Sequence, residues 1–346
     1  MSPPRDAVAD LRRIAFLLEA ASEPTFRVRA FRNAAATLAR LGTEEVARRT
    51  AAGSLRSVPG IGEVLERTIA ESLRGEEPVY LRRLEATGGL PVAELGAELR
   101  LALRGDCHVH SDWSDGGASI RDMAEAAAGE GHAYFALTDH SPSLKVANGL
   151  SAERLEQQLA EVAALNRDLA PFRILSGIEV DIRPDGSLDQ SDELLARLDL
   201  VVGAVHSELR MEERGMTRRL VTALANPLLD VLAHPTGRML AGPRRRPPSE
   251  FDAGIVFAAA ASLDKAIEVN SRPERLDPPK RLLRLAVEAG CRIAIDSDAH
   301  APGQLAWLPR GCDRAAACGV PVDGVVNAWS AERVVEWARA HRTTGA

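Results

Sequence analysis

GDCHVHSDWSDG, residues 105–116, places two histidines, a cysteine and three acidic residues within twelve positions of a chain that has eight histidines in all. The run LRGDCHVH that opens this stretch predicts a short buried strand. Because side chains alternate along a strand, His108 and His110 point to one side and can reach one ion, while Cys107 points away into the core. The stretch therefore predicts part of a metal site at the end of a strand.

Six similar apolar runs follow this one, separated by amphipathic helical stretches such as AERLEQQLAEVAALNRDLA, residues 152–170. Strand-like runs that alternate with helices predict a parallel βα array. We expect this α/β array to close as a barrel, because of the residues at which its runs end. The six runs are AYFALTDH (133–140), FRILSGIEVDI (172–182), LDLVVGAVH (198–206), LDVLAHP (229–235), KAIEVN (265–270) and CRIAIDSDAH (291–300).

Residues of metal-ligand type stand at the ends of these runs or just after them. In a βα barrel the carboxyl ends of the strands converge on one face, where active sites lie. Six histidines and three carboxylates exceed the needs of one tetrahedral ion, so we expect two or three divalent ions, with Mn²⁺, Zn²⁺ and Fe²⁺ all suited to these ligands. The predicted ligands are His108, His110, Asp115, His140, Glu179, His206, His234, Asp298 and His300.

Several neighbours of these residues are expected to have other roles. His132 precedes its strand and His341 lies in a C-terminal helix, so neither is predicted to bind a metal. The acidic neighbours are expected to contact the ligands from outside or to face solvent. They are Asp106, Asp112, Asp181 and Asp296.

The first 103 residues have helical periodicity throughout. Within them SLRSVPGIGEVLERTIAESL, residues 54–73, places a Pro-Gly-Ile-Gly turn between two short helical stretches, as in a helix-hairpin-helix. The amides of Gly60 and Gly62, at the start of the second helix, would then form a phosphate cradle. A plain turn between helices is the alternative.

Composition bounds the class of protein. The chain has 346 residues, and we expect two domains, 1–103 and 104–346. No apolar run approaches the length of a membrane span, so we expect a soluble, cytoplasmic protein. The four cysteines are expected to be buried thiols. Residues 1–104 carry 16 Arg against 14 acids, a net +2, while the remainder carries 27 Lys and Arg against 35 acids, a net −8. Bound cations would offset the acidic part, and the basic part suits a polyanion.

The motifs GDCHVHSDWSDG, LTDHS, GIEVDI, VVGAVHS, AHPTGR and DSDAH, in this order, closely resemble the PHP (polymerase and histidinol phosphatase) superfamily, and above all the C-terminal PHP domain of bacterial DNA polymerase X proteins. FRVRAFRNAAATL and VPGIGEVLERTIAESL resemble the helical DNA-end-binding domain of the same polymerases. The resemblance implies a distorted (βα)7 barrel with a trinuclear metal site. It assigns one ion to His108, His110, Glu179 and Asp298, a second to Glu179, His206 and His234, and a third to Asp115, His140 and His300.

The sequence departs from that family in two ways. The nucleotidyl-transfer domain should lie between the two regions, yet Leu103 runs directly into the PHP start, so we expect no polymerase activity. Residues 1–104 also contain no lysine, so a lyase reaction through a lysine Schiff base is not expected from this domain.

The first hypothesis for function is a metal-dependent phosphoesterase that acts on DNA ends. It would be a 3′–5′ exonuclease, with removal of 3′-phosphates or cutting at abasic sites as further activities, and it would bind the DNA backbone without reading sequence. Asp115 and His140 are predicted to be catalytic, and Arg238 to hold a phosphate, although a surface ion pair would also explain Arg238. The alternatives are a histidinol-phosphate-type phosphatase and a nucleic-acid-binding scaffold with a structural metal site; deleting residues 1–104 should impair only an enzyme that acts on DNA.

Overall fold

The computed structural model describes residues 3–87, 90–242 and 245–343. The chain divides into two compact units, residues 1–90 and 91–346, and each is described here by itself. No helix in the described residues combines the length and the apolar character needed to cross a membrane.

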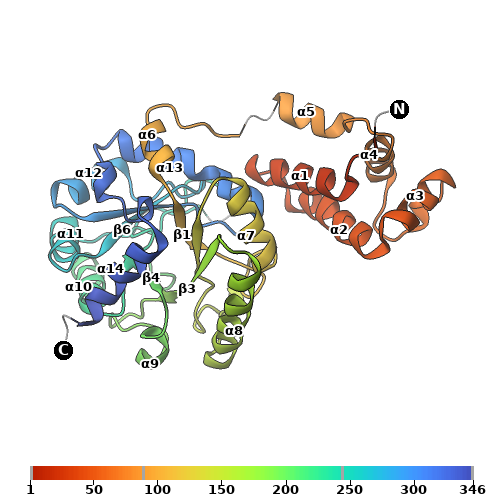
Figure 1. Cartoon of the computed structure of the whole chain (residues 1–346). Helices are drawn as coiled ribbons and strands as arrows, with labels where there is room; N and C mark the ends of the chain where they lie inside the picture. Colours follow the sequence, from red (N-terminus) through yellow and green to blue (C-terminus); the bar gives the residue numbers. More distant parts are fainter. Residues whose placement is uncertain (1–2, 88–89, 243–244, 344–346) are drawn as a thin grey trace. The chain divides into compact units, whose positions relative to one another are not determined.

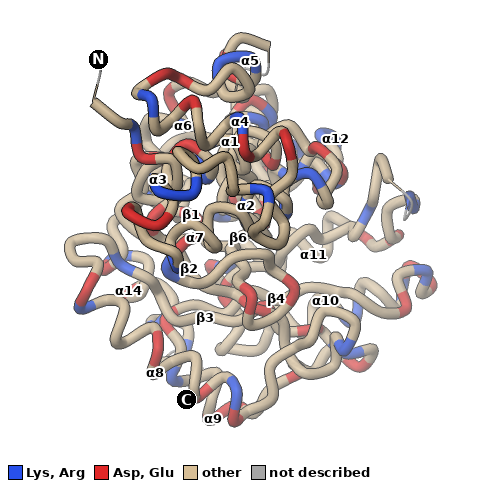
Figure 2. Tube along the Cα trace, turned by 90° about the vertical axis from the view of Figure 1, so that its right-hand side faces the viewer, with Lys and Arg blue, Asp and Glu red and all other residues tan. Residues whose placement is uncertain are grey.

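The N-terminal unit is entirely helical. Apolar side chains at three- and four-residue spacing, such as Leu11, Ile14 and Leu18, are fully buried where α1 packs on α2. Basic and acidic residues alternate along the traces of these helices (Figure 2). The elements are α1 (Ala7–Ala20), α2 (Thr25–Leu41), α3 (Thr43–Ala51), the 3-10 helix η1 (Leu55–Ser57), α4 (Glu63–Leu73) and α5 (Val79–Thr87).

The Pro-Gly-Ile-Gly turn joins η1 to α4. Val58 and Ile61 are buried in the core of the unit, while Gly60 is exposed with φ of +85°, a conformation that favours glycine. Gly62 is the N-cap residue of α4. No atom lies within 4 Å of a Cβ built on either glycine, so the surface over this turn is open.

The second unit is a barrel of seven parallel strands in the order β1 to β7, surrounded by helices (Figure 1). The α/β fold class and the distorted seven-stranded barrel are as predicted, as is the all-helical domain before it. The strands are β1 (Gly105–Val109), β2 (Tyr134–Leu137), β3 (Arg173–Asp181), β4 (Leu200–Ala204), β5 (Val231–Leu232), β6 (Ala266–Asn270) and β7 (Arg292–Asp296).

Polar side chains cap the N-termini of several barrel helices. The side chains of Ser119, Ser151, Ser191 and Asp252 each accept a hydrogen bond from a backbone N–H in the first turn of the helix that follows. The helices are α6 (Ala97–Ala102), α7 (Ile120–Gly129), α8 (Ala152–Asp168), α9 (Asp192–Leu195), α10 (Glu213–Ala225), α11 (Ala253–Ser262), α12 (Lys280–Glu288), α13 (Leu308–Ala316) and α14 (Ala331–Thr343), with 3-10 helices η2 (Lys145–Ala147), η3 (Pro302–Trp307), η4 (Val322–Gly324) and η5 (Val326–Ala328).

The barrel closes between β7 and β1 through side chains and one isolated parallel bridge between Val109 and Ala299, without a regular strand ladder. The backbone N–H of Cys107 donates to Asp296 at 2.8 Å, and Ser297 donates to Asp106 from both its backbone N–H and its hydroxyl. The buried Asn327 side chain accepts from the N–H of Ile295 at 3.1 Å and donates to the carbonyl oxygens of Ile295 and Gly105. We call this junction the β7–β1 seam.

Asn327→Ala is expected to lower the free energy of unfolding of the barrel by about 2–4 kcal/mol, because it leaves buried backbone groups on both sides of the seam without a partner. Urea unfolding followed by tryptophan fluorescence measures this change in the barrel alone, since all four tryptophans lie after residue 104. The exposed Asn33 on α2 provides the control, and Asn33→Ala is expected to leave the transition unchanged. An unchanged midpoint for Asn327→Ala would contradict this role of the seam.

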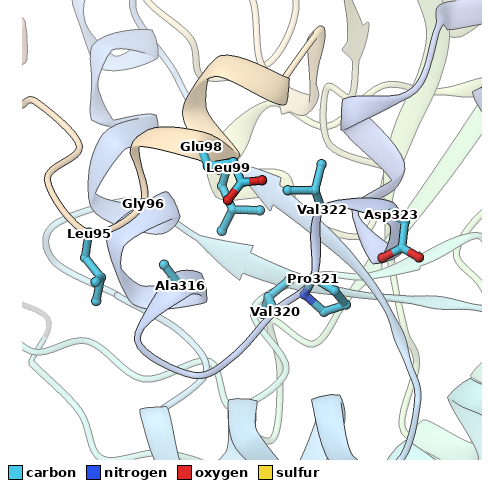
Figure 3. Close-up of a pocket in the computed structure, with 9 residues that line it drawn as sticks. All are labelled: Leu95, Gly96, Glu98, Leu99, Ala316, Val320, Pro321, Val322 and Asp323. Carbon is cyan, nitrogen blue, oxygen red and sulfur yellow. The ribbon is translucent and has the colours of Figure 1, made fainter.

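The helix α6 packs on the barrel, and the two compact units divide between Leu90 and Pro91, while the domain bounds 1–103 and 104–346 stay a prediction. Leu99 and Leu103 belong to the largest core cluster of the barrel, and Asp313 accepts hydrogen bonds from the backbone N–H groups of Glu94 and Gly96. Figure 3 shows α6 beside the segment 316–323, where the two line a pocket of about 570 Å³. None of the predicted ligands lines this pocket.

Candidate metal centre

All nine predicted ligands lie together at the carboxyl end of the barrel. Glu179 lies in β3, and the others belong to β1 or follow a strand closely, so the seven strands carry side chains from distant parts of the chain to one place. The imidazole rings of His110 and His300 are 4.1 Å apart between centroids, and those of His206 and His234 are 5.5 Å apart.

Four donor atoms surround one point at the base of the site. Nε2 of His108 lies 3.5 Å from Oε2 of Glu179 and 4.0 Å from Oδ1 of Asp298, and Nε2 of His110 lies 3.7 and 3.5 Å from the same two oxygens. Ligands of a tetrahedral ion with bonds of about 2.0–2.2 Å are separated by about 3.3–3.6 Å. The donor atoms of His108, His110 and Glu179 lie within 4.8 Å of one another, so these three residues could hold a divalent metal ion, with Asp298 beside them.

Two further groups of donors adjoin this set. Oε1 of Glu179 lies 3.2 Å from Nε2 of His206 and 2.9 Å from Nε2 of His234. Oδ1 of Asp115 lies 3.5 Å from Nε2 of His140 and 3.3 Å from Nε2 of His300. His110 and His140 also come within reach of neighbouring groups. The distribution of the nine residues among separate ions stays a prediction.

Glu179 is the central carboxylate of the cluster. Burial acts to raise its pKa, but His140, His206 and His108 around it hold that pKa well below its usual range. For His110 burial acts together with the nearby His300 and His140, and the pKa of this imidazole is well below its usual value. Burial acts to lower the pKa of His108 and of His206, but the carboxylates around them raise it, so these two imidazoles would have to release a proton when a metal ion binds.

Several buried nitrogen and oxygen atoms of this cluster make no hydrogen bond of ordinary geometry, which is consistent with metal ions as their partners. They include Nε2 of His108, both ring nitrogens of His110 and of His206, and Oε2 of Glu179. Buried polar groups are almost always paired in folded proteins, so a concentration of unpaired ones among strong ligand types is unusual. Metal ions coordinated by these atoms would satisfy them.

Exposure distinguishes the mouth of the site from its base. The Asp115 side chain is 38% exposed and that of His300 is 16% exposed, whereas those of His108, His110 and Glu179 are at most 1% exposed. A ligand from solvent therefore meets the Asp115, His140 and His300 group first.

Two ligands have an uncommon backbone conformation. His234 has φ of +23° and Asp298 has φ of +54°, values that side-chain-bearing residues rarely adopt. Such conformations persist only where the surrounding contacts enforce them, and they often occur at functional sites.

The structure adds residues that the sequence analysis did not select. Glu268 contacts His108 from β6, while Nη1 of Arg272 lies 2.9 Å from Nδ1 of His300 and Nε of Arg275 lies 3.2 Å from Oδ2 of Asp298. A signal for Glu268 was present, because KAIEVN places one carboxylate inside an apolar run that supplied no predicted ligand. Nothing in the sequence directed the two arginines toward the site.

The four acidic residues next to the predicted ligands have different surroundings. Asp181 accepts a hydrogen bond from the backbone N–H of His206 and lies 3.3 Å from Nδ1 of its ring, whereas Asp112 is exposed. Asp106 and Asp296 are fully buried in the β7–β1 seam, and burial raises the pKa of Asp106 to about 6. Neither of these two carboxylates faces solvent, and both accept hydrogen bonds from backbone N–H groups across the seam.

The remaining histidines lie outside the cluster. His132 is buried, and burial together with Arg100 lowers the pKa of His132 to about 3. Nδ1 of His341 lies 2.8 Å from the buried Asp230.

Part of the Arg238 guanidinium is hydrogen-bonded to the backbone. Its Nε donates to the carbonyl oxygen of Arg275 at 3.0 Å, and its Nη2 donates to that of Leu276. The role of Arg238 in holding a phosphate stays a prediction.

Comparison with known families agrees with this division of the chain. A helix-hairpin-helix domain family matches residues 2–77, and the PHP domain family matches residues 106–271. The two matched segments fall within the helical unit and the barrel.

Individual relatives point the same way. The DNA polymerase/3′-5′ exonuclease PolX of Bacillus subtilis (strain 168) is 44% identical over 232 residues, which cover 67% of this chain and 40% of that protein. A probable phosphatase of Acetivibrio thermocellus is 28% identical over 244 residues, 68% of this chain and 94% of that protein. The histidinol phosphate phosphatase of Lactococcus lactis, solved with zinc, L-histidinol and phosphate, aligns with a TM-score of 0.42 and 18% identity over 63% of this chain and 94% of that one. The chain thus joins a helix-hairpin-helix domain to a domain of the PHP family.

Proposed function

We propose that the chain is a metal-dependent phosphoesterase that degrades DNA from its ends, as a 3′–5′ exonuclease without polymerase activity. The observation that carries the proposal is the complete cluster of nine ligands in a chain that also has a helix-hairpin-helix unit. Similarity to PolX, which is named as an exonuclease, supports the DNA substrate. Only residues 78–105 lie between the matched helix-hairpin-helix and PHP segments, too few for a further domain, and this supports the lack of polymerase activity.

The ligands would hold two or three divalent ions in the partition given by the resemblance. Mn²⁺, Zn²⁺ or Fe²⁺ in such a cluster would lower the pKa of water and neutralise charge on a phosphate that is attacked. Glu179 would serve two ions at once, because each of its oxygens faces a different set of imidazoles. Burial excludes bulk water from His108 and His110 at the base.

Asp115 and His140 would act at the mouth of the site. Their side chains are 3.5 Å apart, and Asp115 is the more exposed, so a phosphate that enters the barrel comes within their reach. Asp115 and His140 would orient that phosphate for attack. The helical unit would bind the DNA backbone through the open turn at Gly60 and Gly62, independently of sequence.

A 5′-labelled DNA duplex incubated with the Mn²⁺-loaded protein tests this function. We expect a ladder of labelled products that shorten from the 3′ end, and no ladder with a His108→Ala/His110→Ala variant. A duplex that ends in a 3′-phosphate and one with an abasic site, run in parallel, test the two further activities. An intact oligonucleotide from a preparation that releases phosphate from histidinol phosphate would instead favour a small-molecule phosphatase, the function that the name of the Acetivibrio relative suggests.

A further inference from the structure

Glu268 is a buried carboxylate that contacts ligands of two different predicted ions. Its side chain is fully buried in β6, and Oε1 lies 2.6 Å from Nδ1 of His108. Oε2 accepts hydrogen bonds from the backbone N–H of His234 at 2.6 Å and from Nδ2 of Asn270 at 3.1 Å. Both oxygens are therefore used by protein donors, and Glu268 has a different role from the nine ligands.

The contact with His108 selects one form of its imidazole. An ionised carboxylate only accepts hydrogen bonds, so Nδ1 is the nitrogen that donates to Glu268, and Nε2 would bind a metal ion through its lone pair. That lone pair faces the space between Glu179 and Asp298, at 3.5 and 4.0 Å. A carboxylate behind a histidine ligand in this way fixes the ring and makes the ligand more basic.

The contact with His234 acts on the main chain. β5 has only two residues, and His234 follows it with φ of +23°. The hydrogen bond from its N–H to Glu268 holds this turn, and the ring then lies with Nε2 2.9 Å from Oε1 of Glu179. Removal of the acceptor would release the turn that orients the second set of ligands.

The third set is oriented by other means. His300 is contacted by Arg272, whose Nη1 lies 2.9 Å from Nδ1 of the ring, and Asp115 lies in the loop after β1. No contact joins Glu268 to Asp115, His140 or His300 among the described residues, so these three residues do not depend on it directly.

We propose that Glu268 is a positioning residue that couples two of the ion sites, those of His108 and His234, while leaving the third independent. The proposal rests on the metal-dependent function proposed above. It makes a distinctive prediction for metal content, because one substitution should empty two sites together and spare the remaining one.

Glu268→Gln tests this coupling without reference to catalysis. The amide offers one oxygen where the carboxylate offers two, so either His108 or the His234 N–H faces an NH₂ group. We expect the affinity for Zn²⁺ at both dependent sites to fall about 10- to 100-fold, a usual effect of losing such a partner. Elemental analysis after equilibration at fixed free Zn²⁺ should show the variant retaining one ion under conditions that saturate the wild-type chain.

Asp230→Asn is the matched control, because Asp230 is another fully buried carboxylate paired with a histidine, His341, away from the cluster. We expect it to keep the wild-type metal content. Glu268→Asp provides a second variant if the glutamine variant does not fold, since it keeps the charge but reaches only one of the two partners. Unchanged metal content in the Glu268 variants, loss of all ions at once, or an equal loss in Asp230→Asn would overturn the proposal. Because the readout is metal content, an inactive nuclease would not affect this result.

Discussion

Glu179→Gln is expected to reduce phosphoester hydrolysis by at least about a thousandfold. Glu179 contacts five of the six histidines of the cluster through its two oxygens, at 2.7 to 3.7 Å. Glutamine keeps the shape but removes the charge and turns a donor toward imidazole nitrogens. Ions of this kind stabilise a transition state by several kcal/mol, and each 1.4 kcal/mol corresponds to tenfold in rate.

The measurement is the initial rate on labelled duplex DNA, with metal content determined on the same samples. Glu161→Gln is the control, because Glu161 accepts a hydrogen bond from Trp113 at 3.1 Å and is not among the ligands. We expect its rate to stay close to wild type. A Glu179→Gln variant with wild-type rate and full metal content would contradict the proposed site.

A chain shortened to residues 91–346 is expected to degrade DNA much less efficiently while it still hydrolyses small phosphomonoesters. The removed unit carries the helix-hairpin-helix, whose contacts with DNA phosphates would supply sequence-independent affinity. We expect KM for duplex DNA to rise at least about tenfold, with kcat on a small phosphomonoester changed by less than about twofold. Steady-state kinetics on both substrates provides the comparison.

The position of the cut matters for this experiment. A chain that starts at residue 105 would lack Leu99 and Leu103, which are buried in the barrel core, and it should unfold at lower urea concentration than the 91–346 chain. Unaltered DNA degradation by the 91–346 chain would show that the helical unit does not bind the substrate.

The barrel and the cluster of ligands could be predicted because two independent signals coincide in the sequence. Apolar runs gave the strands, and a histidine or carboxylate near the end of most of them gave the common face. Even β5, which has only two residues, was found because LDVLAHP leads directly to His234.

Other features depend on contacts that no local pattern records. Glu268 becomes significant only when the fold brings it to His108, 160 positions earlier in the chain. Similarly, the spacing of Leu99 and Leu103 predicts a helix but not which of two cores it packs against, and in the structure it packs on the barrel. The left-handed backbone of His234 and Asp298 is also enforced by tertiary contacts alone.

The β7–β1 seam has a consequence for how the barrel opens. Ligands stand on both of its edges, with His108 and His110 on one side and Asp298 and His300 on the other. An ion bound by residues from both edges would hold β1 and β7 together where a regular ladder is lacking. Closure of the barrel and metal binding would then be thermodynamically linked. Amide hydrogens of β1 and β7 should then exchange with solvent more slowly as the free metal concentration rises, while those of β3 and β4, which a ladder already joins, should change little.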